Sequence, residues 1–202
     1  MSGDNGFFKQ WDVHMDNFAG YGLPVGWWSR KFEYPWAIQF ATTEDVVADM
    51  GSGEYYRPFK DGLANICLKT YAVDLNPEES RNHPITYISA NFSKRIEELD
   101  DKSLDKIFCI SVMEECGDME GALWEFQRLL KPDGLAIITL DVQLDITKPL
   151  GKYKAIDLYD FKYKFRKAGF DFKGELDMNQ DFIIFNKELN LKCFHCVLRK
   201  YE

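Results

Sequence analysis

The stretch Val46-Val47-Ala48-Asp49-Met50-Gly51-Ser52-Gly53 decides the fold, because a buried strand runs directly into a glycine-rich turn. The residues before the turn are β-branched or small, as a central strand of a parallel sheet requires. Gly51 and Gly53 permit backbone angles and a close ligand approach that a side chain would block. The stretch therefore predicts a strand at 45–50 that leads into a ligand-binding turn.

Strand and helix signals alternate along the chain from residue 45 onward. Strands are expected at 45–50, 68–74, 85–89, 105–110, 135–140, 180–185 and 191–199, and helices at 56–65, 118–130 and 157–168, with a helical turn at 77–82 and a tight turn at 131–134. This alternation predicts an α/β, Rossmann-like fold with a doubly wound, mostly parallel seven-stranded sheet. The connection at 186–190 is hairpin-like and would add an antiparallel C-terminal edge.

Residues 1–44 differ from this core because they are rich in aromatic side chains and glycine. We expect two short helices there, at about 5–18 and 29–41, joined by a turn-rich link. They would form an N-terminal helical cap on a core at 45–202, either as a lid over a pocket or as a fixed cover. Trp27, Trp28 and Trp36 then either line an acceptor pocket or belong to the hydrophobic core. The 202 residues are expected to form one domain.

The composition narrows the class of partner. A formal net charge of -8 argues against a nucleic-acid partner, because phosphate binding favours basic patches. The five cysteines are scattered and odd in number, which is typical of free thiols in a reducing compartment. No secretory signal opens the chain, and no apolar stretch approaches bilayer-spanning length. We expect a cytoplasmic monomer or homodimer that binds neither nucleic acid nor membrane.

Polar side chains follow the predicted strands at the sheet edge where a doubly wound fold binds its ligand. Asp49 precedes the glycine turn, and Asp74 ends the second strand, at the spacing of about twenty residues where an acid accepts from ribose hydroxyls. Asn91 follows the third strand and can bind an adenine amino group, with Phe92 beside it to pack on the ring. Ser111 follows the fourth strand, where a substrate would meet the cofactor.

The glycine pattern also excludes two classes of ligand. Gly51-Ser52-Gly53 is followed by Glu54-Tyr55-Tyr56, so the third glycine of a G-x-G-x-x-G dinucleotide fingerprint is missing. No G-K-[ST] sequence follows the turn, so it is not a phosphate-binding P-loop. The turn suits a ligand that carries an amine and a carboxylate better than it suits a pyrophosphate.

In order and spacing, these segments resemble the class I S-adenosylmethionine-dependent methyltransferases over roughly residues 45–199. The matching segments are Asp49-Met50-Gly51-Ser52-Gly53 (the D-x-G-x-G motif), Tyr71-Ala72-Val73-Asp74-Leu75-Asn76, Ala90-Asn91, Leu104-Asp105-Lys106-Ile107, Ser111-Val112-Met113-Glu114, and Leu129-Leu130-Lys131-Pro132-Asp133-Gly134. The resemblance implies S-adenosyl-L-methionine as cofactor and S-adenosyl-L-homocysteine as its product. The residues implied to bind the cofactor are Asp49, Met50, Gly51, Ser52, Gly53, Asp74, Leu75, Asn91, Phe92 and Ser111.

The resemblance implies transfer of a methyl group from a sulfonium to a nucleophile, with alignment supplying much of the catalysis. A base is needed only if the nucleophile arrives protonated, and the candidates are Glu115, Glu114 and His14. Glu115 stands where many small-molecule members have a histidine, so no histidine base can be assigned. Glu115 is otherwise a solvated acid at a helix start, and His14 a surface residue of the first expected helix.

Two functions remain open from the sequence. The first is O- or N-methylation of a small molecule or biosynthetic intermediate, with a sugar among the candidates. The second is a methyltransferase-like cofactor-binding or partner module without turnover. A metal site at Cys193-Phe194-His195-Cys196 is not expected, because on a strand Cys193 and His195 face one side and Cys196 the other.

Overall fold

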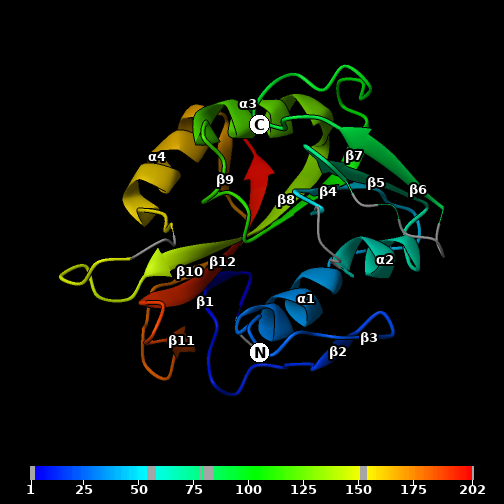
Figure 1. The fold of residues 1–202 in the computed structure, drawn as a ribbon. Coiled ribbons are helices and arrows are strands. Elements are labelled where there is room, and N and C mark those ends of the chain that lie inside the picture. The colour runs from blue at the N-terminus through cyan, green and yellow to red at the C-terminus, as the bar shows by residue number, and fades with distance from the viewer. Residues whose placement is uncertain (1–2, 54–57, 78, 80–83, 151–153, 202) are drawn as a thin grey trace.

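The computed structural model describes residues 3–53, 58–77, 79, 84–150 and 154–201. A ten-stranded mixed sheet lies at the centre of this part of the chain (Figure 1). Its strands are β1 (Asn5–Phe7), β4 (Val46–Met50), β5 (Lys69–Asp74), β6 (Ile85–Ser89), β7 (Leu104–Ile110), β8 (Leu130–Gln143), β9 (Phe170–Phe172), β10 (Leu176–Asp177), β11 (Phe185–Asn186) and β12 (Leu191–Lys200). The helices are α1 (Arg30–Ile38), α2 (Phe59–Ala64), α3 (Met119–Leu129) and α4 (Leu158–Lys167).

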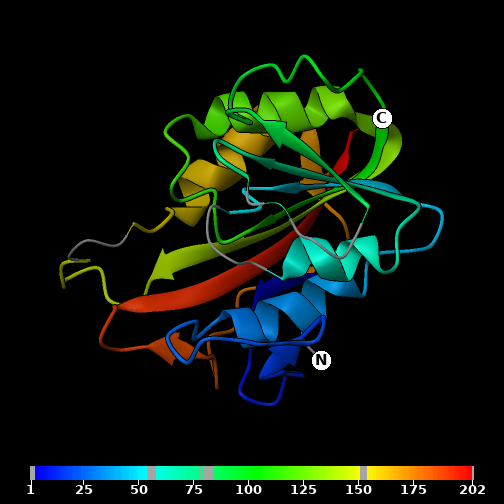
Figure 2. The same cartoon turned by 45° about the vertical axis from the view of Figure 1, so that its right-hand side comes forward.

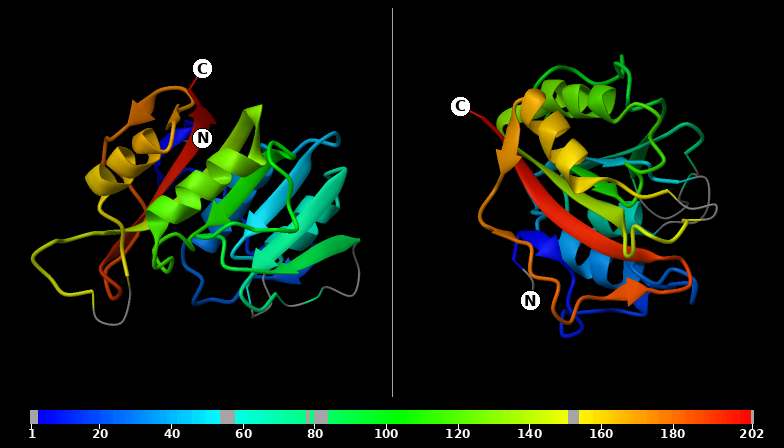
Figure 3. Two further views of the ribbon diagram at one scale, coloured as in Figure 1. Left: turned by 90° about the horizontal axis from the view of Figure 1, so that it is seen from above. Right: turned by 90° about the vertical axis from the view of Figure 1, so that its left-hand side faces the viewer.

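The parallel core of the sheet has the strand order β8-β7-β4-β5-β6. The long strand β12 runs antiparallel to β8 along most of its length. Helices α1 and α2 lie on one face, and α3 and α4 lie on the other (Figures 1 and 2; Figure 3, left, views the second face from above). The prediction of an α/β fold with a central, mostly parallel sheet and helices on both faces is therefore confirmed, although the sheet has ten strands among the described residues and not seven.

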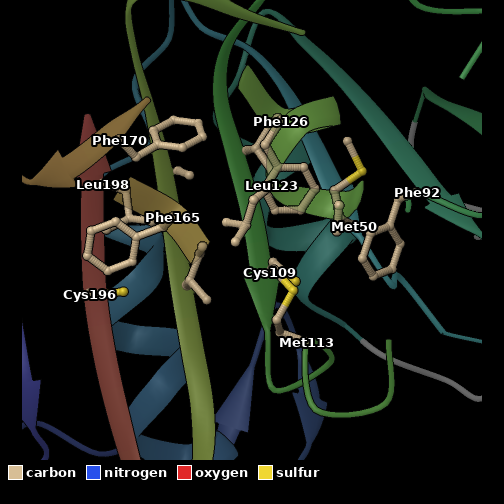
Figure 4. Close-up of a cluster of buried hydrophobic side chains, with 14 of the residues drawn as sticks. Met50, Phe92, Cys109, Met113, Leu123, Phe126, Phe165, Phe170, Cys196 and Leu198 are labelled. Carbon is tan, nitrogen blue, oxygen red and sulfur yellow. The ribbon is translucent and has the colours of Figure 1, made fainter. Parts of the chain in front are cut away.

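Two hydrophobic layers hold the helices on the sheet. Successive residues of a strand point to opposite faces, so β7 directs Ile107 and Cys109 toward α3 and α4 but Phe108 toward α1 and α2. Figure 4 shows the first layer, where Leu123 and Phe126 of α3 pack beside the strand side chains. This alternation explains why the central strands are apolar throughout rather than at every second position.

The first half of the N-terminal segment differs from the expectation. Residues 5–18 form no helix: β1 pairs antiparallel with β12, and β2 (Asn17–Phe18) and β3 (Tyr21–Gly22) form a small separate hairpin. Phe7 and Phe8 are both buried, but they enter opposite layers of the core. A helix would place these neighbouring side chains on one side, whereas an extended strand separates them. The predicted helical cap is therefore wrong here, because this segment extends the sheet.

The second expected helix is confirmed as α1, and a proline inside it ties it to the preceding segment. Pro35 has no N–H, so the carbonyl of Lys31, four residues earlier, lacks its helical donor. The backbone N–H of Met15 donates to that carbonyl at 2.9 Å instead. The proline thus leaves an acceptor that anchors the chain at Met15 to the helix.

Strands β4 to β7 and helices α3 and α4 lie within about two residues of their predicted ranges, and α4 is followed by Gly169 at φ +86°. The tight turn predicted at 131–134 is instead an irregularity within β8, where the pairing to β7 shifts register after Leu104. The strand predicted at 180–185 is shortened to β11, and β9 occupies a place beside β12. The helical turn predicted at 77–82 lies largely outside the described residues. None of the described helices is long and apolar enough to cross a membrane.

Acid is expected to destabilise the fold through His195, which is fully buried between the rings of Phe8 and Trp36, with centroids 4.5 Å away. Burial lowers the pKa of His195 to about 4 from 6.5. Between these two values the unfolded chain binds the proton and the folded chain does not, so the contribution of His195 to the free energy of unfolding falls as the pH drops from 6.5 to 4. The expected loss is about 3 kcal/mol.

The measurement is the free energy of unfolding in urea at a series of pH values. The stability of His195→Leu relative to the parent should rise by about 3 kcal/mol as the pH drops from 6.5 to 4, since the other titrating groups contribute alike in both proteins. His14→Leu, at an exposed position, should show no such change relative to the parent. An unaltered slope in His195→Leu would contradict the assignment.

Candidate active site

A cleft of about 350 Å³ opens at the C-terminal ends of the parallel strands. Its walls come from the turns after β4, β5 and β6 and from the segment after β7. The lining residues are Gly51, Gly53, Asp74, Leu75, Ala90, Asn91, Phe92, Ser111, Val112, Glu115, Cys116 and Gly117. Parallel strands end at the same sheet edge, so residues far apart in sequence meet there.

The glycine turn and the end of β5 are held together by hydrogen bonds. The N–H groups of Gly51 and Ser52 donate to the carbonyl of Val73 at 2.8 and 3.1 Å, and the N–H of Gly53 donates to Oδ2 of Asp74 at 2.9 Å. Both glycines have positive φ, +77° at Gly51 and +93° at Gly53. Asp74 therefore fixes the turn, and although its Oδ1 also accepts from the N–H of Asn76 at 3.3 Å, the carboxylate at the cleft wall retains further lone pairs.

The adenine-binding residues predicted from sequence lie on one side of the cleft. Leu75 is 70% exposed there, an unusual exposure for a large apolar side chain at a strand end. Asn91 uses its Oδ1 to accept from the N–H and Oγ of Ser93, at 3.0 and 2.7 Å, so it forms a local turn. Phe92 is 8% exposed and packs on Phe126, with the ring centroids 6.0 Å apart. Phe92 is thus mainly a core residue with one edge at the cleft.

The remaining predicted residues divide into two groups. Glu115 lines the cleft, and its Oε2 lies 2.9 Å from Nζ of Lys154. Asp49, Met50 and Ser52 are buried behind the glycine turn and do not line the cleft. His14 is exposed in the segment before β2, with its ring 5.3 Å from that of Phe32, and it does not line the cleft either.

A family model described as a methyltransferase domain matches residues 48–138. This range contains every residue that lines the cleft. Residues 48–138 carry a methyltransferase domain. The resemblance recognised in the sequence is thereby confirmed, and with it S-adenosylmethionine as the cofactor of the domain.

Solved structures share the fold at low sequence identity. The [4+2]-cyclase SpnF has a TM-score of 0.66 and 12% identity, covering 96% of this chain and 88% of that chain. A TehB-like S-adenosylmethionine-dependent methyltransferase from Corynebacterium glutamicum has a TM-score of 0.60 and 18% identity, and the match covers 84% of this chain and 87% of that chain. The third is the 1,6-didemethyltoxoflavin-N1-methyltransferase of Burkholderia thailandensis, with 1,6-didemethyltoxoflavin and S-adenosylhomocysteine bound. It has a TM-score of 0.58 and 17% identity, and the match covers 87% of this chain and 81% of that chain. No curated protein matches the chain in sequence.

A buried polar network joins the methyltransferase domain to the N-terminal helix. Glu33 of α1 is fully buried, and its Oε1 accepts from the hydroxyls of Ser111 and Thr139 at 2.5 and 2.6 Å. Its Oε2 lies 2.5 Å from Arg30, which also donates to the carbonyl of Ser111 at 3.2 Å. Although burial opposes its ionisation, the Arg30 charge and these hydrogen bonds lower the pKa of Glu33. Ser111, at φ +42°, is thus held from α1 and β8 together.

Two further carboxyls lie beyond Ser111 at the same edge of the sheet. The N–H of Asp141, within β8, donates to Oε1 of Glu114 at 2.9 Å. Burial and the Asp141 charge raise the pKa of Glu114 to about 8, and burial and the Glu33 charge raise that of Asp141 to about 7. Sequence reasoning missed Asp141, although an acid directly after the apolar run 135–140 is the same signal that identified Asp74.

The aromatic residues of the N-terminal segment separate into core and surface groups. Trp36 is buried against Phe8 and Phe40, so it belongs to the core. Trp27 and Trp28 line a different hollow of about 520 Å³, which also includes Phe185 of β11. None of these three tryptophans lines the cofactor cleft.

Proposed function

We propose that this protein transfers a methyl group from S-adenosylmethionine to an oxygen or nitrogen of a small molecule or biosynthetic intermediate, with a sugar among the candidate acceptors. The observation that carries the proposal is the cleft within the matched domain. There the Gly51–Gly53 turn, Asp74 and Ser111 meet at adjacent strand ends.

The cleft suits the chemistry of this cofactor. Asp74 offers carboxylate lone pairs to the ribose hydroxyls, and the exposed side of Leu75 offers an apolar surface to the adenine ring. Gly51 and Gly53 leave the backbone open to the methionine end. When bound, the cofactor supplies an electrophilic methyl carbon, so the protein mainly aligns the two reactants and excludes water.

The acceptor is proposed to approach from the side of Ser111. Residues 111, 112 and 115–117 line the cleft beyond the glycine turn, and the next strand in that direction is β8. The Burkholderia thailandensis protein of the same fold methylates a small molecule, as its name states, which supports a small-molecule acceptor here.

Calorimetric titration with S-adenosylmethionine, followed by a methyl-transfer assay on a panel of phenols, sugars, amines and N-heterocycles, tests the proposal. We expect saturable binding and turnover of at least one compound. The absence of binding at millimolar cofactor would refute the proposal.

The alternative is a cofactor-binding or partner module without turnover. SpnF has the same fold and is a [4+2]-cyclase, so the fold does not by itself specify methyl transfer. Glu115, the base candidate in the cleft, is paired with Lys154. Cofactor binding without turnover of any panel compound would favour this alternative.

Asp74→Ala is expected to weaken binding of S-adenosylmethionine by roughly 1–3 kcal/mol, or about 5- to 150-fold. The substitution removes the acceptor for ribose hydroxyls and releases the N–H of Gly53. Calorimetry measures the effect, with Asp133→Ala, an exposed acid outside the cleft, as the control. Equal affinities for the parent and Asp74→Ala would place the ribose elsewhere.

A further inference from the structure

Two carboxyl oxygens at the sheet edge are buried without a hydrogen-bond partner among the described residues. They are Oε2 of Glu114 and Oδ1 of Asp141. Glu114 is only 9% exposed, and its other oxygen already accepts from the N–H of Asp141. A buried polar atom without a partner is costly, so the two oxygens indicate a site that a hydrogen-bond donor completes.

The side chains around the two carboxyls do not supply that hydrogen-bond donor. Arg30 of α1 donates to Glu33 and to the carbonyl of Ser111. Glu33, Glu115 and the thiol of Cys193 from β12 add no positive charge, and Lys154 pairs with Glu115. Burial and neighbouring negative charge raise the pKa of Glu114 to about 8 and that of Asp141 to about 7, so the two carboxyls do not both ionise near neutral pH. The pair is therefore at least partly protonated at neutral pH, and whichever carboxyl has lost its proton can accept one.

Neither Glu114 nor Asp141 lines the cofactor cleft, but Glu114 lies in the chain between two residues that do, Val112 and Glu115. Across the sheet, Asp74 lies at the end of β5 and the glycine turn follows β4. Next to them, Ser111 follows β7, and Asp141 lies near the end of β8. Asp74 is assigned to the ribose, so the pair lies at the opposite end, beyond Ser111. This step rests on the proposed function.

We propose that Glu114 and Asp141 together bind the N–H or O–H of the nucleophile and act as the base for methyl transfer. The acceptor is then an amine, an N-heterocycle or a hydroxyl compound, and not a nucleophile without a proton. A lone pair on its nitrogen or oxygen forms the bond to the methyl carbon, and the carbon–sulfur bond breaks with its electrons remaining on sulfur. The proton released by the acceptor passes to the free oxygen of the pair.

The first test uses the protein without cofactor. Infrared difference spectra between pH 5.5 and 9 should show a buried carboxylic acid that titrates in the range of about 7 to 8. Glu114→Gln should remove the step near pH 8 and leave that of Asp141 near 7, and its amide can donate to Asp141 and keep the fold. Glu120→Gln, at a surface acid paired with Lys167, should retain the titration. A spectrum with no carboxyl titrating above pH 6 would overturn the proposal.

The second test is the pH dependence of methyl transfer to whichever panel compound the parent protein methylates. The kcat should fall as the pH drops below about 7, because a fully protonated pair cannot take a proton. Glu114→Gln should lower kcat by about 10²-fold or more with unchanged cofactor affinity, and Glu120→Gln should lower neither. A large loss in Glu115→Gln with none in Glu114→Gln would overturn the assignment.

The two proposals fail differently. Loss of the proposed function would appear as no cofactor binding or no turnover in the parent protein, and this result would count against the base as well. Failure of the base alone would leave cofactor binding and turnover intact while Glu114→Gln behaved like the parent.

Discussion

Glu33→Ala is expected to lower the free energy of unfolding by about 3–5 kcal/mol, because it leaves Arg30, whose side chain is only 14% exposed, without its partner. The substitution also deprives the hydroxyls of Ser111 and Thr139 of their shared acceptor. Urea denaturation measures the loss. Glu44→Ala, the same change at an exposed position after α1, should cost less than about 0.5 kcal/mol.

The pH dependence adds a second readout for Glu33. The pKa of Glu33 is lower in the folded protein than its ordinary value of 4.5. Its contribution to the free energy of unfolding is therefore fully present above pH 4.5 and is lost as the pH falls through the lower pKa of the folded state. The double variant Arg30→Met with Glu33→Leu should recover the part of the stability that the unpaired Arg30 charge costs, but not the part lost because the hydroxyls of Ser111 and Thr139 have no acceptor. A loss in Glu33→Ala no larger than that in Glu44→Ala would contradict this account.

Gly51→Ala is expected to weaken binding of S-adenosylmethionine by more than tenfold, that is by at least about 1.4 kcal/mol. A Cβ at this position would lie 2.3 Å from Cγ1 of Val112 and at φ +77°. The left-handed backbone costs about 1–2 kcal/mol and the overlap about 1–3 kcal/mol more, so the turn must move. Its movement would displace the N–H groups that bond to Val73 and alter the cleft wall.

Gly20→Ala provides the matched control. Gly20 has φ +84°, but a Cβ there would meet no atom within 4 Å, so only the backbone cost applies. Both variants should lose stability, and only Gly51→Ala should lose cofactor affinity. Calorimetry on the two folded variants separates these effects, and equal affinities would show that the turn tolerates a side chain.

Much of the cofactor half of the site could be predicted, because its signals are local. Each of β4, β5, β6 and β7 is a short apolar run that ends in a turn or a polar residue. Gly51, Gly53, Asp74 and Ser111 follow directly from those ends, and the structure brings them to one cleft. Asp49, Met50 and Ser52 belong to the same motif, but a strand that enters the core buries them behind it.

The N-terminal segment could not be predicted in the same way. Aromatic residues in 5–18 fit an amphipathic helix, yet Phe7 and Phe8 enter opposite layers because β12 offers an unpaired edge to β1. That edge exists only once the sheet has formed. Glu33 is likewise an acid among aromatic residues, and its burial depends on donors that lie 78 and 106 residues away.

The amino-acid sequence by itself determined the central parallel strands, the glycine turn and the cofactor-binding acid, since strand period, turn chemistry and motif spacing are local properties of the chain. Only the tertiary structure decided which acids at this sheet edge are buried, because burial depends on neighbours from separate strands and helices. Among the sequence candidates Glu115, Glu114 and His14, our proposal assigns the base to the buried Glu114 beside Asp141, since Glu115 is paired with Lys154 at the cleft.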